Sequence, residues 1–96
     1  MSLDEVKKKL AGNRTELDRF GVKSLSIFGS FARGQAGAAS DVDLLVEFSI
    51  PVGLFAFIRL KHHLETLLGL RVDLVTPDAL KESLREAILK EAIRAA

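Results

Sequence analysis

The chain of 96 residues contains no cysteine, no tryptophan and no tyrosine, and it has only two prolines. The absence of cysteine excludes disulfides, thiol chemistry and cysteine-ligated zinc. No apolar run approaches the roughly 18–20 residues that a membrane-spanning helix needs. The N-terminal segment MSLDEVKKKL is charged and lacks the apolar centre of a signal peptide. We therefore expect a cytoplasmic protein with no membrane partner.

An excess of one charge is also missing. Lysine and arginine together number 14 and aspartate and glutamate 13, so the net charge is only +1. A general nucleic-acid binder would show a basic excess, so long DNA or RNA is not an expected partner. The length predicts a single domain, residues 1–96, with one compact core.

The hydrophobic pattern alternates between helix and strand periods and predicts a mixed α/β (α+β) fold. Ser2 and Glu5 form a capping-box pattern at the start of the first helix, and Gly12-Asn13 is a place where that helix can break. Strand directions do not follow from the pattern. We expect helices over residues 2–20, 54–68 and from Thr76-Pro77 to the C-terminus, a short helical turn over 29–34, a loop over 35–40, and strands over 24–28, 42–48 and 71–75.

Two aspartates lie near the start of the strand expected over 42–48. Asp41 and Asp43 are two residues apart and therefore share one face, roughly 6–7 Å from each other. Two carboxylates in one space repel unless a cation lies between them, and Mg²⁺ is the hard cation that prefers such oxygens. An isolated Asp-x-Asp is, however, common at solvated strand edges.

A third carboxylate, Asp73, lies in an otherwise apolar strand. If that strand is next to Asp43, the three aspartates complete a site for two metal ions of the kind that supports in-line phosphoryl displacement. The alternative is a structural role, in which Asp73 pairs with Arg71 or accepts bonds from the backbone.

Gly29 and Ser30 leave a strand and open a helical turn. Free N–H groups at such a turn attract phosphate, and glycine allows close approach of the backbone. The alternative is that Ser30 is only a helix cap. Arg33, three residues later, is expected either to face a triphosphate or to pair with a site carboxylate. Ser40 is expected to orient Asp41 or to contact a phosphate.

Three other residues call for a simpler interpretation. His62 and His63 are adjacent on a helix and point about 100° apart, so we expect a solvated helix face rather than a metal site. Phe31 follows Ser30 and could lie near a nucleotide base, but core packing is the favoured interpretation.

Taken together, Gly29-Ser30-x-x-Arg33-Gly34, Ser40-Asp41-x-Asp43 and Asp73 resemble the nucleotidyltransferase motif of the DNA polymerase beta superfamily. The short run GSFARGQAGAASDVDLLVEF is similar to the minimal nucleotidyltransferase (MNT) branch. The resemblance covers about residues 20 to 90 and implies a small nucleotidyltransferase fold, with a mixed sheet of about three to four strands flanked by helices.

The resemblance implies a role for each matching position. Asp41, Asp43 and Asp73 would be the catalytic residues and the ligands of two Mg²⁺ ions. The nucleotide triphosphate, expected to be ATP, would be bound by Gly29 and Ser30, with Arg33 and Ser40 in support. A hydroxyl would attack the α-phosphorus, and pyrophosphate would leave.

Three functions remain open at this point. The first is an antitoxin that transfers AMP to a HEPN ribonuclease toxin, as MNT antitoxins of HEPN/MNT pairs do. The second is a small-molecule nucleotidyltransferase of the aminoglycoside type. The third is a non-catalytic antitoxin that acts by binding. Because the catalytic fold uses most of the chain, the acceptor is expected on a partner or in a cleft completed by homo- or hetero-oligomerisation.

Overall fold

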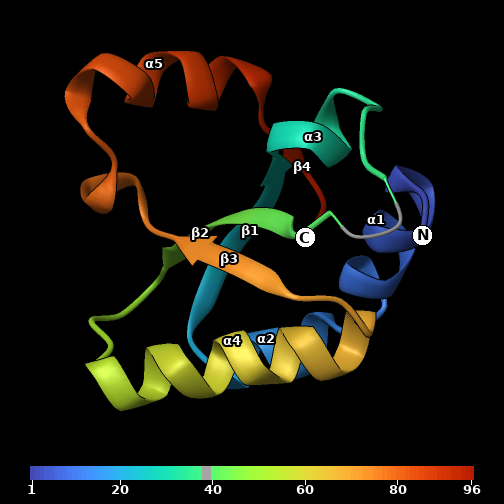
Figure 1. Cartoon of the computed structure of the whole chain (residues 1–96). Coiled ribbons are helices and arrows are strands. Elements are labelled where there is room, and N and C mark those ends of the chain that lie inside the picture. Colours follow the sequence, from blue (N-terminus) through green and yellow to red (C-terminus); the bar gives the residue numbers. More distant parts are fainter. Residues whose placement is uncertain (38–39) are drawn as a thin grey trace.

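The computed structural model describes residues 1–37 and 40–96. Residues 38 and 39, within the loop expected over 35–40, lie outside the described residues. The chain forms a four-stranded sheet with helices on both sides (Figure 1). The elements in chain order are α1 (Leu3–Ala11), α2 (Arg14–Arg19), β1 (Val22–Phe28), α3 (Gly29–Ala32), β2 (Val42–Phe48), α4 (Leu54–Leu68), β3 (Val72–Val75), the 3₁₀ helix η1 (Pro77–Ala79), α5 (Glu82–Glu91) and β4 (Ile93–Arg94).

The sheet has the strand order β3-β2-β1-β4. β1 pairs antiparallel with both β2 and β4, whereas β2 and β3 run parallel. The sheet is therefore mixed, as the resemblance implied. α4 connects the parallel pair β2 and β3, as a parallel connection requires.

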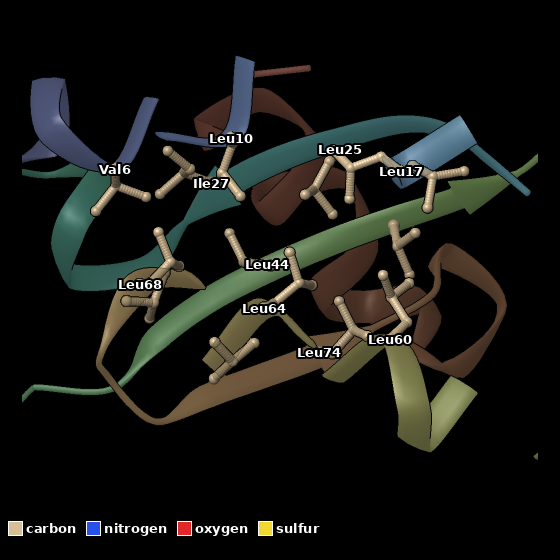
Figure 2. Packing of buried hydrophobic residues seen from close by; sticks show 14 of the residues in the cluster. Val6, Leu10, Leu17, Leu25, Ile27, Leu44, Leu60, Leu64, Leu68 and Leu74 are labelled. Carbon is tan, nitrogen blue, oxygen red and sulfur yellow. The ribbon is translucent and has the colours of Figure 1, made fainter. Parts of the chain in front are cut away.

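The hydrophobic core lies on one face of the sheet, beneath α1, α2 and α4 (Figure 2). Alternate residues of β1 and β2 point into it, because successive side chains of a strand face opposite sides. The fully buried side chains include Val6 and Leu10 of α1, Leu17 of α2, Leu25 and Ile27 of β1, Val42, Leu44 and Val46 of β2, and Leu60, Leu64 and Leu68 of α4. The buried stripe of α4 consists of Leu60, Leu64 and Leu68, whereas Leu54 and Ile58 are exposed.

The first expected helix is divided at Gly12 and Asn13 into α1 and α2. The capping box of Ser2 and Glu5 is present at the start of α1. His63 of α4 reaches the break, where its Nε2 lies 2.6 Å from Asn13 Oδ1 and its ring packs on Phe20. The expectation of a solvated face therefore holds for exposed His62 and is wrong for His63.

The C-terminal segment differs from the helix that the sequence predicts from Thr76-Pro77 to the C-terminus, with a bend between Leu80 and Leu84. Thr76 and Pro77 start only the short η1, α5 begins at Glu82, and the chain then becomes extended. Ile93 and Arg94 form β4 beside β1, and Ala96 accepts a hydrogen bond from the Leu25 amide. Within residues 1–37 and 40–96, no helix combines the length and the apolar character needed to cross a membrane.

Candidate active site

The centre of the candidate site is a pair of aspartates on neighbouring parallel strands. Asp43 of β2 is directly in register with Asp73 of β3. Paired residues of adjacent strands lie about 5 Å apart and present their side chains on the same face. That face is opposite the apolar core, because the neighbours Leu44 and Leu74 are the buried residues. The expected placement of Asp73 beside Asp43 is therefore the one found.

The Asp43 carboxylate is electrostatically unfavourable as an anion. Partial burial raises its pKa, and the negative charges of Asp73 and then Asp41 raise it further, while Arg33 acts in the opposite direction. A site that raises a carboxylate pKa through neighbouring carboxylates is suited to a cation, which would offset the repulsion.

Asp41 lies just before β2, and its Oδ1 is 3.2 Å from Nε of Arg71. The ion pair that the sequence suggested for Asp73 is thus made by Asp41. As the side chains stand, no group of three His, Cys, Asp or Glu residues among those described is arranged to hold a metal ion. The donors are nevertheless all carboxylate oxygens, which fit a hard divalent cation, and exposed Asp41 is near enough for its charge to raise the Asp43 pKa.

Gly29 joins the end of β1 to α3 directly beside Asp43. Its φ is +72°, a conformation that glycine adopts readily and other residues do not. A Cβ atom at this position would lie 2.0 Å from Oδ2 of Asp43. The site therefore requires glycine here for two reasons, the backbone conformation and the close approach of the carboxylate.

α3 is only four residues long and follows Gly29 without interruption. Ser30 is half-buried within it, whereas Phe31 is buried in the hydrophobic core. The expectation that Phe31 packs in the core is confirmed.

Arg33 caps the C-terminal end of α3. Its Nη1 lies 2.6 Å from Oε1 of Glu91, and its Nε donates to Gln35 at 3.1 Å. Of the two expected roles, the one observed is an ion pair, but with a residue of α5 rather than with an aspartate of the pair.

Ser40 uses its hydroxyl to accept a hydrogen bond from the Gly37 amide at 2.8 Å. This contact joins the two ends of the loop whose residues 38 and 39 lie outside the described residues. In this arrangement the hydroxyl stabilises the loop next to Asp41 rather than binding the Asp41 carboxylate itself.

Glu91 is a site residue that the sequence did not reveal. Its carboxylate accepts from the Gly29 amide at 3.1 Å and pairs with Arg33. These two interactions, with Arg33 first, hold the pKa of Glu91 below its usual range. The sequence offered no signal for it, because the helix was expected to run to the C-terminus and its end at Glu91 is seen only in the structure.

An open groove of about 680 Å³ lies along the far half of β2, away from Asp43. Phe48, Ile50, Pro51 and Phe57 form much of its apolar wall, and Leu89 of α5 lies opposite. Leu54 and Phe55 next to it are 69% and 78% exposed. Large apolar side chains exposed side by side mark surfaces that contact other molecules.

A family model, a protein sequence and a solved structure that match this chain are all nucleotidyltransferases. The family model for the nucleotidyltransferase domain matches residues 7–95. Protein adenylyltransferase MntA of Thermococcus cleftensis is 44% identical over 94 residues, covering 97% of this chain and 95% of that protein. A solved structure described as a candidate minimal nucleotidyltransferase has a TM-score of 0.84 at 42% identity, covering 97% of this chain and 95% of the other.

A more distant match comes from the structure of a tri-AMPylated Shewanella oneidensis HEPN toxin in complex with an MNT antitoxin. Its TM-score is 0.66 at 17% identity, with 94% of this chain and 71% of that chain covered. At this identity the match supports the shared fold alone.

The fold, with aspartates in register on adjacent strands and a glycine turn beside them, defines a nucleotidyltransferase. The chain belongs to the nucleotidyltransferase domain family and, within it, to the minimal nucleotidyltransferases.

Proposed function

We propose that the protein transfers the AMP group of ATP to a hydroxyl of a partner protein in the cytoplasm, and that the partner is a HEPN-domain toxin that it neutralises. The observation that carries the reaction is the register of Asp43 with Asp73 beside Gly29. Support for a protein acceptor comes from the relative named protein adenylyltransferase, which matches over nearly its whole length. The HEPN partner is suggested by the antitoxin complex of the same fold.

In this proposal Asp41, Asp43 and Asp73 hold Mg²⁺, with two ions as the full complement. Mg²⁺ would offset the carboxylate repulsion that raises the Asp43 pKa, and it would polarise the phosphate oxygens and the attacking hydroxyl. The Gly29 amide and Ser30 receive the triphosphate, Arg33 neutralises part of its charge, and Ser40 keeps the neighbouring loop in place.

The reaction forms one bond and breaks one. The acceptor hydroxyl oxygen bonds to the α-phosphorus of ATP, and the bond from that phosphorus to the oxygen bridging to the β-phosphate breaks. Pyrophosphate carries away the bonding electrons, and the hydroxyl proton leaves to a carboxylate or to solvent. The exposed apolar surface around Leu54 and Phe55 suits an acceptor that is a macromolecule more than one that is a small sugar.

The test uses a HEPN-domain toxin as the acceptor protein, Mg²⁺, and ATP labelled on either the α- or the γ-phosphate. We expect the α label, and not the γ label, on the HEPN protein. Asp43→Asn should reduce the rate by roughly a hundred- to a thousandfold, the order of effect seen when a main transition-state contact is lost. Asp4→Asn is the matched control, because exposed Asp4 lies in α1, away from both the site and the apolar groove.

Each other outcome points to a different function. Label on an aminoglycoside in the absence of the HEPN protein would favour the small-molecule transferase. A stable complex that neutralises the toxin without label, and equally with Asp43→Asn, would show an antitoxin that acts by binding.

A further inference from the structure

Glu91 occupies the position in the candidate site where a bound anion would contact the Gly29 amide and Arg33. Its two carboxylate oxygens are engaged separately: Oε2 accepts from the Gly29 amide at 3.1 Å, and Oε1 pairs with Arg33 Nη1 at 2.6 Å. A phosphate group has the same charge sign and the same ability to accept from both donors at once. Glu91 therefore occupies the two donors that the proposed function assigns to the triphosphate.

The charge of Glu91 adds to the crowding of anions at the site. The Arg33 and Gly29 contacts keep its pKa low, so it is ionised at neutral pH. Together with Asp73 and Asp41, Glu91 is one of the negative charges that raise the Asp43 pKa, and Arg33 is the cation that opposes them. An incoming triphosphate would meet a site whose nearby arginine is already neutralised.

α5, which carries Glu91, is attached to the rest of the molecule weakly. All ten residues of α5 are described, and none of them is buried. Leu84 and Leu89 of this helix are 52% and 47% exposed. β4 begins two residues after Glu91 and pairs with β1, so it fixes the chain just beyond the helix. Because little apolar surface of α5 is buried, the Glu91 side chain can turn away from Arg33 at a low cost in packing.

The position of Glu91 on its helix also favours release. It is the C-terminal residue of α5, where the partial negative charge of the helix end repels a carboxylate. The Arg33 and Gly29 contacts offset that repulsion. Once a ligand takes these two donors, nothing in the local geometry of α5 favours the carboxylate at this place.

We infer that Glu91 is an internal competitor of the nucleotide: it holds Arg33 and the Gly29 amide in the free protein, and a triphosphate must displace it to bind. The inference rests on the proposed function, which takes these donors as triphosphate ligands. It assigns to Glu91 control of nucleotide affinity. If Glu91 only positioned Arg33 for the nucleotide, its loss would have the opposite effect and weaken binding.

The test is the affinity of the full chain for inorganic tripolyphosphate and for a non-hydrolysable ATP analogue, measured by calorimetry with Mg²⁺. Glu91→Gln keeps the size of the side chain and removes its charge. We expect binding to tighten by roughly five- to twentyfold, the range expected for one charge-assisted contact. Glu86→Gln removes the same charge from α5 at a residue that pairs only with Lys90 among the ion pairs described, and it should change affinity less than twofold.

A second variant tests whether Glu91 affects nucleotide affinity through Arg33. In an Arg33→Gln background the gain from Glu91→Gln should shrink to less than half, because the two residues share one contact and their effects are then not additive. Glu91→Asp, which keeps the charge on a shorter side chain, should fall between the wild type and Glu91→Gln. Circular dichroism melts show that each variant is folded.

Unchanged or weaker binding by folded Glu91→Gln would overturn the inference, as would an equal gain from Glu86→Gln. If labelled AMP still reaches the partner in that case, only the role of Glu91 is wrong. If neither the wild type nor Glu91→Gln binds tripolyphosphate or the analogue, and no label is transferred, the proposed function fails as well.

Discussion

The two faces of the sheet are built for different purposes. The face beneath α1, α2 and α4 is apolar, and its side chains are almost completely removed from water. The opposite face carries Asp43, Asp73 and Glu47, and α5 lies on that side, apart from the strands, with no residue of its own buried (Figure 1). Because side chains alternate along a strand, β2 serves both faces at once. Stability thus comes from one set of residues, and the charged site is placed on the other.

The largest expected effect on stability comes from the core face. Leu64→Ala in α4 removes a fully buried side chain and should lower the free energy of unfolding by about 2–5 kcal/mol. Leu84→Ala on α5, which is 52% exposed, should change it by less than about 0.5 kcal/mol. Urea denaturation of both variants provides the measurement. Equal losses would show that α5 contributes to the core as much as α4.

A smaller loss is expected where the two faces meet at Gly29. Gly29→Ala imposes a disfavoured positive φ, worth about 1–2 kcal/mol, and it also pushes against the Asp43 carboxylate. Gly34→Ala is the control, because its φ of +69° is similar but, apart from its chain neighbours, no atom in residues 1–37 and 40–96 lies within 4 Å of the added Cβ. Thermal melts should show the larger loss for Gly29→Ala, and only this variant should lose transferase activity. Equal losses of melting temperature in Gly29→Ala and Gly34→Ala would show that contact with the Asp43 carboxylate does not require glycine at position 29.

The smallest expected effect has the opposite sign. The Asp43 pKa is higher in the folded protein than in the unfolded chain. The free energy of unfolding therefore falls as the pH rises from the unfolded to the folded pKa, because ionised Asp43 is less favourable in the folded state. Asp43→Asn removes this cost. At neutral pH the metal-free variant should gain a few tenths to about 1 kcal/mol, since solvent screens the half-exposed carboxylates.

Melting curves of wild type and Asp43→Asn at pH 4 and pH 7 measure this difference. The advantage of the variant should be greater at pH 7, above the ordinary aspartate pKa of about 3.9. A lower melting temperature for Asp43→Asn at pH 7 would mean that Asp43 stabilises the fold. The site face would then contribute to stability, as the core face does.

The sequence predicted those elements whose signals lie within a few consecutive residues. The capping box at Ser2, the glycine that ends α4 at Gly69 and the alternation along β2 each reside in a few consecutive residues. The placement of Asp73 beside Asp43 was the sequence hypothesis for the site. The observed register also depends on the parallel pairing of β2 and β3, which the pattern did not specify.

What could not be predicted depends on contacts between distant parts of the chain. β4 is two residues long, and nothing in Ile93-Arg94 indicates that it pairs with β1. The contacts of Glu91 span 58 and 62 residues, and in the sequence Glu91 is one more acid on a charged helix. His63 was assigned to solvent because its partner Asn13 lies 50 residues away.

The order of the strands has a consequence for how the protein behaves at high concentration. The two outer strands, β3 and β4, are the shortest, with four and two residues, while the long strands lie inside. Short outer strands leave few free backbone groups for another chain to pair with, and exposed Asp73 places a charge on one of them. The carboxylate that we propose as a metal ligand therefore also places a charge where it disfavours pairing of the open sheet edge with another chain.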